Sequence, residues 1–259
     1  MQKIESIKEL HSILLEMAKA FHNVCVEENI PYYMVGGTML GAIRHKGFIP
    51  WDDDMDFGVP RRYYNSLKEA LKQKLPKQYD VLSRDSGIIL TGFFKIADNR
   101  TVHEHSWDID PSKQFGINID IFPLDYASKK WKRTMITYML KLQNLKFYKA
   151  CDRTLPKKIL AYIVKLLFFF ANKDFFFDII EKFLIEKKGD YLVNNYGIYG
   201  MKEILPADLF GEPQLYEYED IHLYGVEKWD IYLKKIYGNY MQLPPEDKRH
   251  THITSMYWK

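Results

Sequence analysis

The fold is decided by the stretch Met34–Tyr64, which reads MVGGTMLGAIRHKGFIPWDDDMDFGVPRRYY. A short apolar run just before the glycines, Tyr32–Val35, predicts a strand, and the glycine pair breaks it. A helical turn over Thr38–His45 and a second strand over Met55–Val59 are expected to follow. The stretch therefore predicts strand, helix and strand in close succession, with an acidic run, DDDMD, leading into the second strand.

Asp54 and Asp56 alternate along this second strand, and alternate residues of a strand point to the same side. Met55 and Phe57 would then face the core. Two carboxylates on one side form a ligand pair for a hard cation such as Mg²⁺, which shares its remaining sites with substrate phosphates. The alternative is a solvent-exposed acidic turn, and the flanking Trp51 and apolar strand argue against it.

Gly36, Gly37 and Thr38 follow one strand and open a helix. Glycines let a phosphate approach the backbone closely, and the free N–H groups at a helix start bind anions. A plain strand-to-helix turn is the alternative. Three cations follow that could bind phosphate oxygens, although such a triplet is usually a solvated helix end. They are Arg44, His45 and Lys46.

Asp120 interrupts an apolar strand predicted over Phe115–Phe122, where an unpaired buried carboxylate would be costly. Either it lies on an exposed edge of the sheet or it faces a metal ion. An acidic pair already stands on an earlier strand, which favours the metal. The three predicted ligands are Asp54, Asp56 and Asp120, and the ion would be Mg²⁺, with Mn²⁺ as an alternative.

Hydrophobic spacing predicts the remaining elements and divides the chain into three parts. The first, 1–126, is a catalytic core with an N-terminal helix at 4–28, a helix from Pro60 to about Lys74, and strands at 78–83 and 88–96. The second, 127–190, is a basic helical subdomain with helices at 128–150, 156–171 and 174–188. The third, 191–259, is loop-rich apart from a helix near 226–237 and is expected to complete the site.

Length and composition are those of a globular protein, with 259 residues, 47% hydrophobic and 27% charged. Cys25 and Cys151 form no CxxC pair, which argues against a disulfide scaffold or a zinc cluster. This cysteine usage predicts a cytoplasmic location, and the N-terminal stretch lacks the apolar core of a signal peptide. The aromatic fraction of 15% fits a packed core, or an aromatic surface at a ligand or membrane.

Positive charge is concentrated in residues 127–173, which hold twelve Lys or Arg against one acid and so carry +11. One reading is an ordinary helical subdomain with solvated lysines. The other is a surface that rests on an anionic bilayer, which would place the protein peripherally at the inner face of the plasma membrane. Nucleic acid is a third partner for a basic patch, but the phosphate-binding motifs give it no role.

Three blocks of this sequence resemble the LicD family of phosphocholine transferases, which is related to the fukutin group. The first is the stretch Gly36–Tyr64, and the second is IDIFPLD at Ile119–Asp125. The third is YLKKIYGNYMQLPPEDKRHTH at Tyr232–His252. Together the blocks span most of the chain, and the match is weakest in the basic helical region.

The resemblance implies an α/β (α+β) nucleotidyltransferase-type fold, a small mixed β-sheet flanked by helices with an appended, mainly helical region. In that fold a glycine turn holds phosphates, a D-x-D pair binds magnesium and a third aspartate arrives from a later strand. Asp52 also matches the motif and is expected beside the ligands, while Asp53 is expected to be exposed. The matching positions are Gly36, Gly37, Thr38, Asp54, Asp56 and Asp120, together with Arg44, His45, Lys46, Trp51 and Arg61.

Members that resemble this sequence transfer phosphocholine from CDP-choline to a sugar hydroxyl of a bacterial surface glycan. The resemblance implies that donor, and a lipid-linked or surface glycan of teichoic acid or lipopolysaccharide type as acceptor. Other CDP-linked head groups (ethanolamine, glycerol or a pentitol) and a D-x-D glycosyltransferase are the alternatives. A choline head would need an aromatic cage, meaning a set of rings that contact the cation. The candidates are Trp51, Tyr32, Tyr33 and Trp107.

Overall fold

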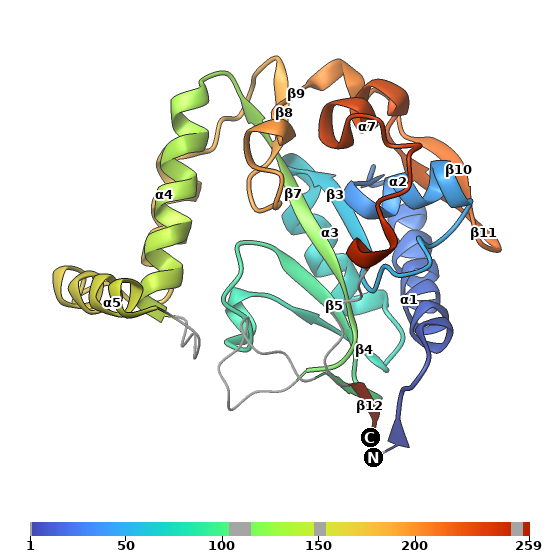
Figure 1. Ribbon diagram of the computed structural model, residues 1–259, viewed down its shortest axis with the longest axis horizontal. Helices are drawn as coiled ribbons and strands as arrows, with labels where there is room; N and C mark the ends of the chain where they lie inside the picture. Colours follow the sequence, from blue (N-terminus) through green and yellow to red (C-terminus); the bar gives the residue numbers. More distant parts are fainter. Residues whose placement is uncertain (1, 104–114, 148–153, 250–255) are drawn as a thin grey trace.

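A mixed β-sheet lies at the centre of the molecule, and helices pack against it (Figure 1). The computed structural model describes residues 2–103, 115–147, 154–249 and 256–259. Within these residues the sheet has nine strands. They are β2 (Tyr33–Met34), β3 (Asp56–Pro60), β4 (Tyr79–Leu82), β5 (Phe94–Asp98), β7 (Asn118–Ala127), β8 (Tyr191–Asn194), β9 (Leu205–Pro206), β10 (Gln214–Tyr218) and β11 (Ile221–Gly225).

The strand order is β10-β11-β2-β3-β7-β5-β4, with β8 paired to the second half of β7 and β9 paired to β8. Strand β3 is antiparallel to β2 and parallel to β7, and this parallel pairing places Asp56 opposite Asp120. A smaller sheet joins the two ends of the chain, with β12 (Met256–Trp258) between β1 (Gln2–Lys3) and β6 (Thr101–His103). The predicted mixed sheet flanked by helices is confirmed.

Helices appear where the hydrophobic spacing predicts them, with ends shifted by a few residues. They are α1 (Ile7–Glu27), α2 (Gly36–His45), α3 (Arg61–Lys74), α4 (Lys130–Phe147), α5 (Leu155–Leu167), α6 (Phe175–Ile179) and α7 (Trp229–Tyr237). A π-helical turn, Ile180–Leu184, continues α6, and short 3₁₀ turns lie at Arg84–Ser86, Gly200–Glu203, Ala207–Leu209 and Glu246–Lys248. Helix α1 starts at a cap in which the Ser6 hydroxyl accepts a hydrogen bond from the Glu9 N–H at 3.1 Å.

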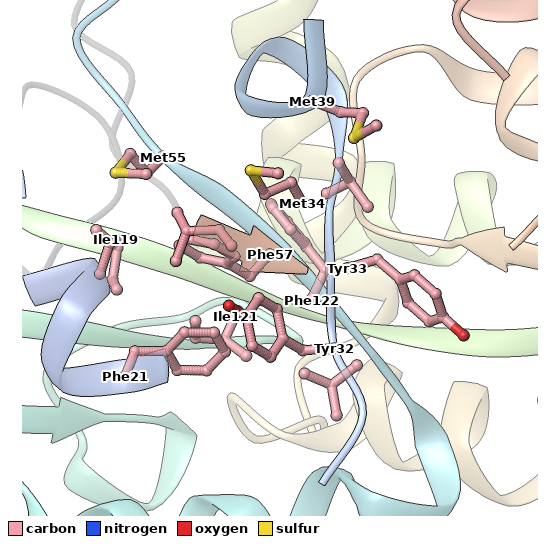
Figure 2. Close-up of a cluster of buried hydrophobic side chains, with 14 of the residues drawn as sticks. Phe21, Tyr32, Tyr33, Met34, Met39, Met55, Phe57, Ile119, Ile121 and Phe122 are labelled. Atoms are coloured by element: carbon pink, nitrogen blue, oxygen red, sulfur yellow. The ribbon is translucent and has the colours of Figure 1, made fainter. Parts of the chain in front are cut away.

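The core beneath the sheet fixes the register of β3 (Figure 2). Phe21 of α1 packs on both Tyr32 and Phe57, with ring centroids 4.8 Å apart in each case. Met55 and Phe57 are fully buried, as predicted. Burying one such side chain contributes about 1.5–3 kcal/mol, and a slip of one residue would expose Phe57 and bury Asp56. The apolar residues therefore hold Asp56 on the opposite side of the strand.

The structure differs from the sequence prediction in two strands and in the C-terminal segment. The strand expected at 88–96 begins only at Phe94, and the strand expected to end at Phe122 runs on to Ala127. The segment 191–259 was expected to be loop-rich, yet it supplies β8, β9 and the hairpin β10–β11. The hairpin turn contains Glu219 at φ 54°, where Gly or Asn would normally signal such a turn, so its sequence gave no cue.

Helices α4 and α5 stand to one side of the sheet (Figure 1). Ile136 of α4 packs against Ile180 and Leu184 in a small apolar cluster of their own. In the part of the chain that the structure describes, no helix combines the length and the apolar character that crossing a bilayer requires. The three-part division of the chain stays a prediction.

Candidate active site

The acidic run lies against the first turn of α2, and the two glycines make this approach possible. A side-chain carbon on Gly37 would lie 2.7 Å from Asp52 Oδ2, and one on Gly36 would lie 3.4 Å from Asp56 Oδ2. Gly36 also has φ +55°, a conformation that favours glycine. The start of a helix carries partial positive charge, which stabilises nearby carboxylates. The glycine pair thus lets acidic side chains reach the helix start.

Carboxylates of the acidic run and of strands β3 and β7 lie near one another at this point. Oxygen atoms of Asp52, Asp53 and Asp54 lie within 4.8 Å of one another. Asp56 stands opposite Asp120 on the parallel strands β3 and β7. The charges of Asp54, Asp56 and Asp120 influence one another, so the three predicted ligands form one electrostatic group.

Two details of the acidic run differ from expectation. Asp54 lies just before β3 rather than on it, so the alternation of strand side chains places Asp56 but not Asp54. Asp53 was expected to be exposed, and it is half-buried, whereas Asp54 is the exposed member of the run. The loop that holds Asp52, Asp53 and Asp54, which we call the acidic loop, therefore contributes carboxylates to the site together with β3.

The group holds more negative charge than its surroundings neutralise. Burial and then the neighbouring carboxylates raise the pKa of Asp54 to about 8 and that of Asp52 to about 6. The same two causes raise the pKa of Asp56. The Asp54 side chain is open to solvent, but the protein around it still desolvates its charge. A bound cation would restore these groups to their charged form.

Lys95 is the principal positive charge facing the carboxylates among the described residues, and sequence reasoning missed it. Its buried Nζ lies 2.6 Å and 2.9 Å from the two oxygens of Asp120, which also accept a hydrogen bond from Asn118 Nδ2 at 2.8 Å. The edge-strand alternative for Asp120 is wrong, because β7 lies between β3 and β5. The available signal was a lysine inside the apolar run FFKIA at 93–97.

Thr38 was predicted to bind phosphate through its hydroxyl. In the structure it is buried, and its Oγ1 accepts a hydrogen bond from the Asp56 N–H at 2.8 Å. That bond ties the start of β3 to the first turn of α2. Thr38 therefore positions Asp56, and direct binding of phosphate stays a prediction.

The three cations of α2 lie in different surroundings. Arg44 is half-buried and donates from Nη1 to the Tyr240 carbonyl at 2.7 Å, and its charge interacts with Asp52. Burial and the charge of Arg44 lower the pKa of His45. Lys46 is exposed at the left-handed cap of α2, about 15 Å along the helix from Gly36 at 1.5 Å per residue. The structure thus brings Arg44, but not Lys46, into electrostatic reach of the carboxylates.

Arg61 does not reach the site either. It donates to both oxygens of the fully buried Asp125, at 2.6 Å and 3.1 Å. Asp125 follows Asp120 by five residues of β7, a separation of about 16 Å along a strand. Arg61 therefore forms an internal ion pair at the far end of the same strands, away from the carboxylates.

Tyrosines from the C-terminal part cover the first turn of α2. The hydroxyl oxygen of the buried Tyr232 accepts a hydrogen bond from the Gly36 N–H at 2.9 Å. The hydroxyls of Tyr199 and Tyr237 lie 2.7 Å apart, and both side chains approach Gly36. Burial, together with the charges of Asp56, Asp52 and Asp54, raises the pKa of Tyr199 to about 12. The signal for Tyr232 and Tyr237 was the C-terminal block that contains them, and Tyr199 had none.

The aromatic cage suggested for choline is wrong for two of its four members. Tyr32 and Tyr33 are buried in the core (Figure 2), and the Tyr32 hydroxyl lies 2.7 Å from His22 Nδ1. Trp51 is half-buried, and the guanidinium of Arg249 lies 5.1 Å from its ring centroid. Trp107 lies outside the described residues. The Trp51 ring therefore already makes a cation–π contact with Arg249, which is the interaction that a choline head would need.

Comparison with known proteins identifies the family of this chain. Residues 29–160, half of the chain, match the family described as LicD/FKTN/FKRP, nucleotidyltransferase domain. The chain belongs to the LicD family. The matched range contains the glycine pair, the acidic run and Asp120, so it spans all of the predicted ligands of this LicD-family protein.

The relatives of this LicD-family chain include transferases. It is 29% identical to the lipopolysaccharide cholinephosphotransferase LicD of Haemophilus influenzae, over 97% of this chain and 98% of that protein. It is 41% identical to the human ribitol 5-phosphate transferase FKRP over 46 residues, 18% of this chain and 9% of that protein. The prediction of a transferase is confirmed at the level of the family.

A solved structure, terminal uridylyl transferase 4 from Trypanosoma brucei with bound GTP, aligns with 76% of this chain and 57% of its own. The identity is 11% and the TM-score 0.24, which is too low to bear on the fold. The fold assignment therefore rests on the family match and on the mixed sheet itself.

Proposed function

We propose that this LicD-family protein transfers phosphocholine from CDP-choline to a sugar hydroxyl of a bacterial cell-surface glycan precursor, in a metal-dependent reaction. One observation carries the proposal. The excess of carboxylates at the glycine-containing helix start lies in a chain that aligns end to end with a lipopolysaccharide cholinephosphotransferase. The acceptor we favour is of the lipopolysaccharide type, and a teichoic acid precursor is the alternative.

The residues present fit Mg²⁺, with Mn²⁺ as the alternative ion. They offer oxygen ligands only, which both ions prefer. Burial and the neighbouring carboxylates raise the pKa values of Asp54 and Asp56, and a bound cation would offset both effects. Asp54, Asp56 and Asp120 would hold the ion, with Asp52 beside them. Bound metal supplies neutralisation of the charge on the transferring phosphoryl group and on the departing CMP.

The chain's own residues then have distinct tasks. The acceptor hydroxyl oxygen forms a bond to the phosphorus of phosphocholine, the bond to CMP breaks, and CMP leaves with the electron pair. The hydroxyl proton passes to Asp120, whose carboxylate Lys95 and Asn118 hold in place. The start of α2 and Arg44 stabilise the remaining phosphate charge. We assign no such role to Lys46 or Arg61, because the structure places both away from the carboxylates.

A second candidate is transfer of a pentitol phosphate from a CDP-linked donor. The observation that favours it is the similarity to ribitol 5-phosphate transferase FKRP over 46 residues. The chemistry at phosphorus would be the same, and only the head group would differ. We place this candidate second because the alignment spans 18% of the chain, against 97% for the cholinephosphotransferase.

The test is release of CMP by the purified chain with a glycan acceptor and a panel of donors. The panel holds CDP-choline, CDP-ethanolamine, CDP-glycerol and CDP-ribitol, each with Mg²⁺, with Mn²⁺ or with EDTA. We expect release from CDP-choline with metal and none with EDTA, and the Asp54→Asn variant serves as the inactive control. Release from CDP-ribitol alone would select the second candidate. Sugar transfer from a radiolabelled sugar nucleotide, without CMP release from any donor, would establish the glycosyltransferase instead.

A further inference from the structure

Helix α5 carries its large apolar side chains on the outside. It lies at the margin of the molecule, at the end of α4 and away from the sheet (Figure 1). Ala161 and Val164 are buried, but Leu155 and Tyr162 are each 71% exposed and Leu166 is 64% exposed. An ordinary surface helix shows the reverse arrangement, with its apolar stripe buried and polar residues outward.

The exposed residues form a continuous stripe. At 100° per residue, the positions opposite Ala161 and Val164 recur with spacings of three and four. We call this stripe the outer face of α5; it consists of Leu155, Ile159, Tyr162, Ile163 and Leu166, all exposed. Phe169 and Phe170 continue it beyond the helix and are 81% and 62% exposed. Contiguous exposed apolar surface of this kind marks an interaction site.

The charged residues of α5 and of the segment just after it have one sign. Residues 154–173 contain four lysines and no acid, and all of them lie within the described residues. Lys158 and Lys165 are exposed on the flank of the stripe. An apolar stripe bordered by lysines, with aromatic residues at one end, is the composition of a helix that lies in the interface of an anionic bilayer.

Helix α4, by contrast, uses several of its cations internally. Lys132 pairs with Glu186 at 3.0 Å, and the buried Arg133 donates to the Asn195 carbonyl at 2.8 Å. Lys146 donates to the carbonyls of Phe168 and Ala171, just after α5. Lys132 and Arg133 thus hold α4 against the rest of the protein, and Lys146 ties α4 to the segment that follows α5.

We propose that the outer face of α5, with Phe169 and Phe170, docks on an anionic phospholipid bilayer. The helix has 13 residues and is about 20 Å long, whereas spanning the hydrocarbon core takes about 30 Å, so it lies in the interface rather than across it. A second copy of the chain is a poorer occupant, because the lysines of the two copies would repel each other. The inference goes beyond the proposed function, since it needs neither donor nor metal.

The experiment is co-sedimentation of the full chain with vesicles of phosphatidylcholine alone or of phosphatidylcholine with phosphatidylglycerol. The first variant is Ile163→Ser/Leu166→Ser, and its matched control is Val26→Ser/Leu215→Ser, which changes two exposed apolar residues elsewhere. The second variant is Lys158→Glu/Lys165→Glu, with Lys8→Glu/Lys77→Glu as its control. Far-UV circular dichroism checks that every variant is folded, and sedimentation velocity gives the oligomeric state.

We expect the parent and both controls to bind the anionic vesicles in low salt and to bind phosphatidylcholine weakly. The serine variant should bind at least about tenfold more weakly, because each removed side chain would have left water on docking. The glutamate variant should lose the preference for anionic lipid, and salt should weaken binding by the parent. Absence of parental binding at low salt would overturn the proposal. So would a parental dimer that the serine variant dissociates while vesicle binding stays unchanged.

Discussion

Strands β3 and β7 carry charged residues at both ends, and the two ends differ in whether these charges are paired. Where β3 begins, Asp56 and Asp120 face each other, and the acidic loop adds further carboxylates, with Lys95 opposing them. Where β3 ends, Arg61 meets the buried Asp125 in a two-pronged ion pair that Asn195 completes with a hydrogen bond at 2.9 Å. We call these the acidic end and the paired end.

This difference in charge pairing distinguishes a functional site from a structural ion pair. At the paired end, burial opposes the charge of Arg61, but attraction and hydrogen bonds from Asp125 outweigh it and raise its pKa. At the acidic end no such balance exists, and the pKa values of Asp52, Asp54 and Asp56 are all raised. A charge that is satisfied inside the protein holds the fold together. An uncompensated excess is the mark of a site that acts on something brought from outside.

The largest effect is expected at the acidic end, from Asp56→Asn. This change removes a ligand charge at nearly constant volume, so transfer should fall at least about 1000-fold, the scale of several kcal/mol of lost charge stabilisation. CMP release measures it, and thermal unfolding confirms that the fold is kept. Asp80→Asn, on the exposed surface of β4, is the matched control. Turnover within a few-fold of the parent would remove Asp56 from the ligand set.

At the paired end, Arg61→Met should destabilise the protein and leave the chemistry nearly intact. It strands a fully buried carboxylate, which costs about 3 kcal/mol or more in the free energy of unfolding. Denaturant unfolding measures this loss, and CMP release per folded molecule should stay within a few-fold. A large rise in KM for the donor with unchanged stability would instead return Arg61 to the phosphate-binding role that its motif position implies.

Asp120→Ala should lower turnover at least about 100-fold, the scale of a missing base or a misplaced metal. Single-turnover CMP release separates this loss from weaker donor binding. Asp125→Ala makes the equivalent change on the same strand at the paired end, and it should act through stability instead. Equal turnover in Asp120→Ala and the parent would exclude Asp120 as base or metal ligand and leave only its ion pair with Lys95.

Lys95→Met sharpens the comparison, because it makes the acidic end still more negative. Without metal the variant should unfold at a lower temperature than the parent. Its affinity for Mg²⁺ should rise about tenfold or more, since a neighbouring positive charge no longer competes. Thermal unfolding over a Mg²⁺ titration measures both quantities, and Lys72→Met, at an exposed ion pair, is the control. Weaker metal binding in Lys95→Met would mean that Lys95 chiefly positions Asp120.

The smallest effect concerns pH in the presence of EDTA. A carboxyl whose folded pKa exceeds its unfolded value contributes stability below the unfolded value, and this contribution is lost as pH rises through the folded pKa. For Asp54 the window runs from 3.8 to about 8. Asp54→Asn should therefore gain on the parent as pH rises through this window, by about 2–4 °C at its upper end for each kcal/mol relieved. Calorimetry in EDTA measures the difference, which excess Mg²⁺ should abolish, and a difference that shrinks with rising pH would contradict the charge argument.

Local patterns were sufficient to predict the parts of the site that one strand determines. Met55 and Phe57 fix which way β3 faces, so the placement of Asp56 followed from alternation alone. The spacing of apolar residues likewise predicted α1, and Pro60 predicted the start of α3. Strand alternation could not place Asp54, because it lies in the loop before the strand, where no periodicity applies.

Features that depend on distant segments could not be read from the sequence. Pairing Lys95 with Asp120 requires knowing that β5 lies next to β7, and neither residue signals the other. The same holds for Arg61 and Asp125, because the motif position of Arg61 suggested ligand binding rather than an ion pair. Which cations of residues 127–173 are already bound could not be read from the sequence either, because only packing pairs Lys132 with Glu186 and Arg133 with the Asn195 carbonyl.

The hydrogen bond from Gly36 to Tyr232 has a consequence for how the protein is made. The two residues are 196 positions apart, and Arg44 and Tyr240 are joined across the same interval. Ribosomes add about 5–20 residues per second, so Gly36 waits about 10–40 s before its partner is synthesised. During that time α7, which covers the acidic loop and the first turn of α2, has not yet been synthesised. The nascent chain therefore carries its carboxylates long before it can close its site, and catalysis has to wait for α7 to emerge.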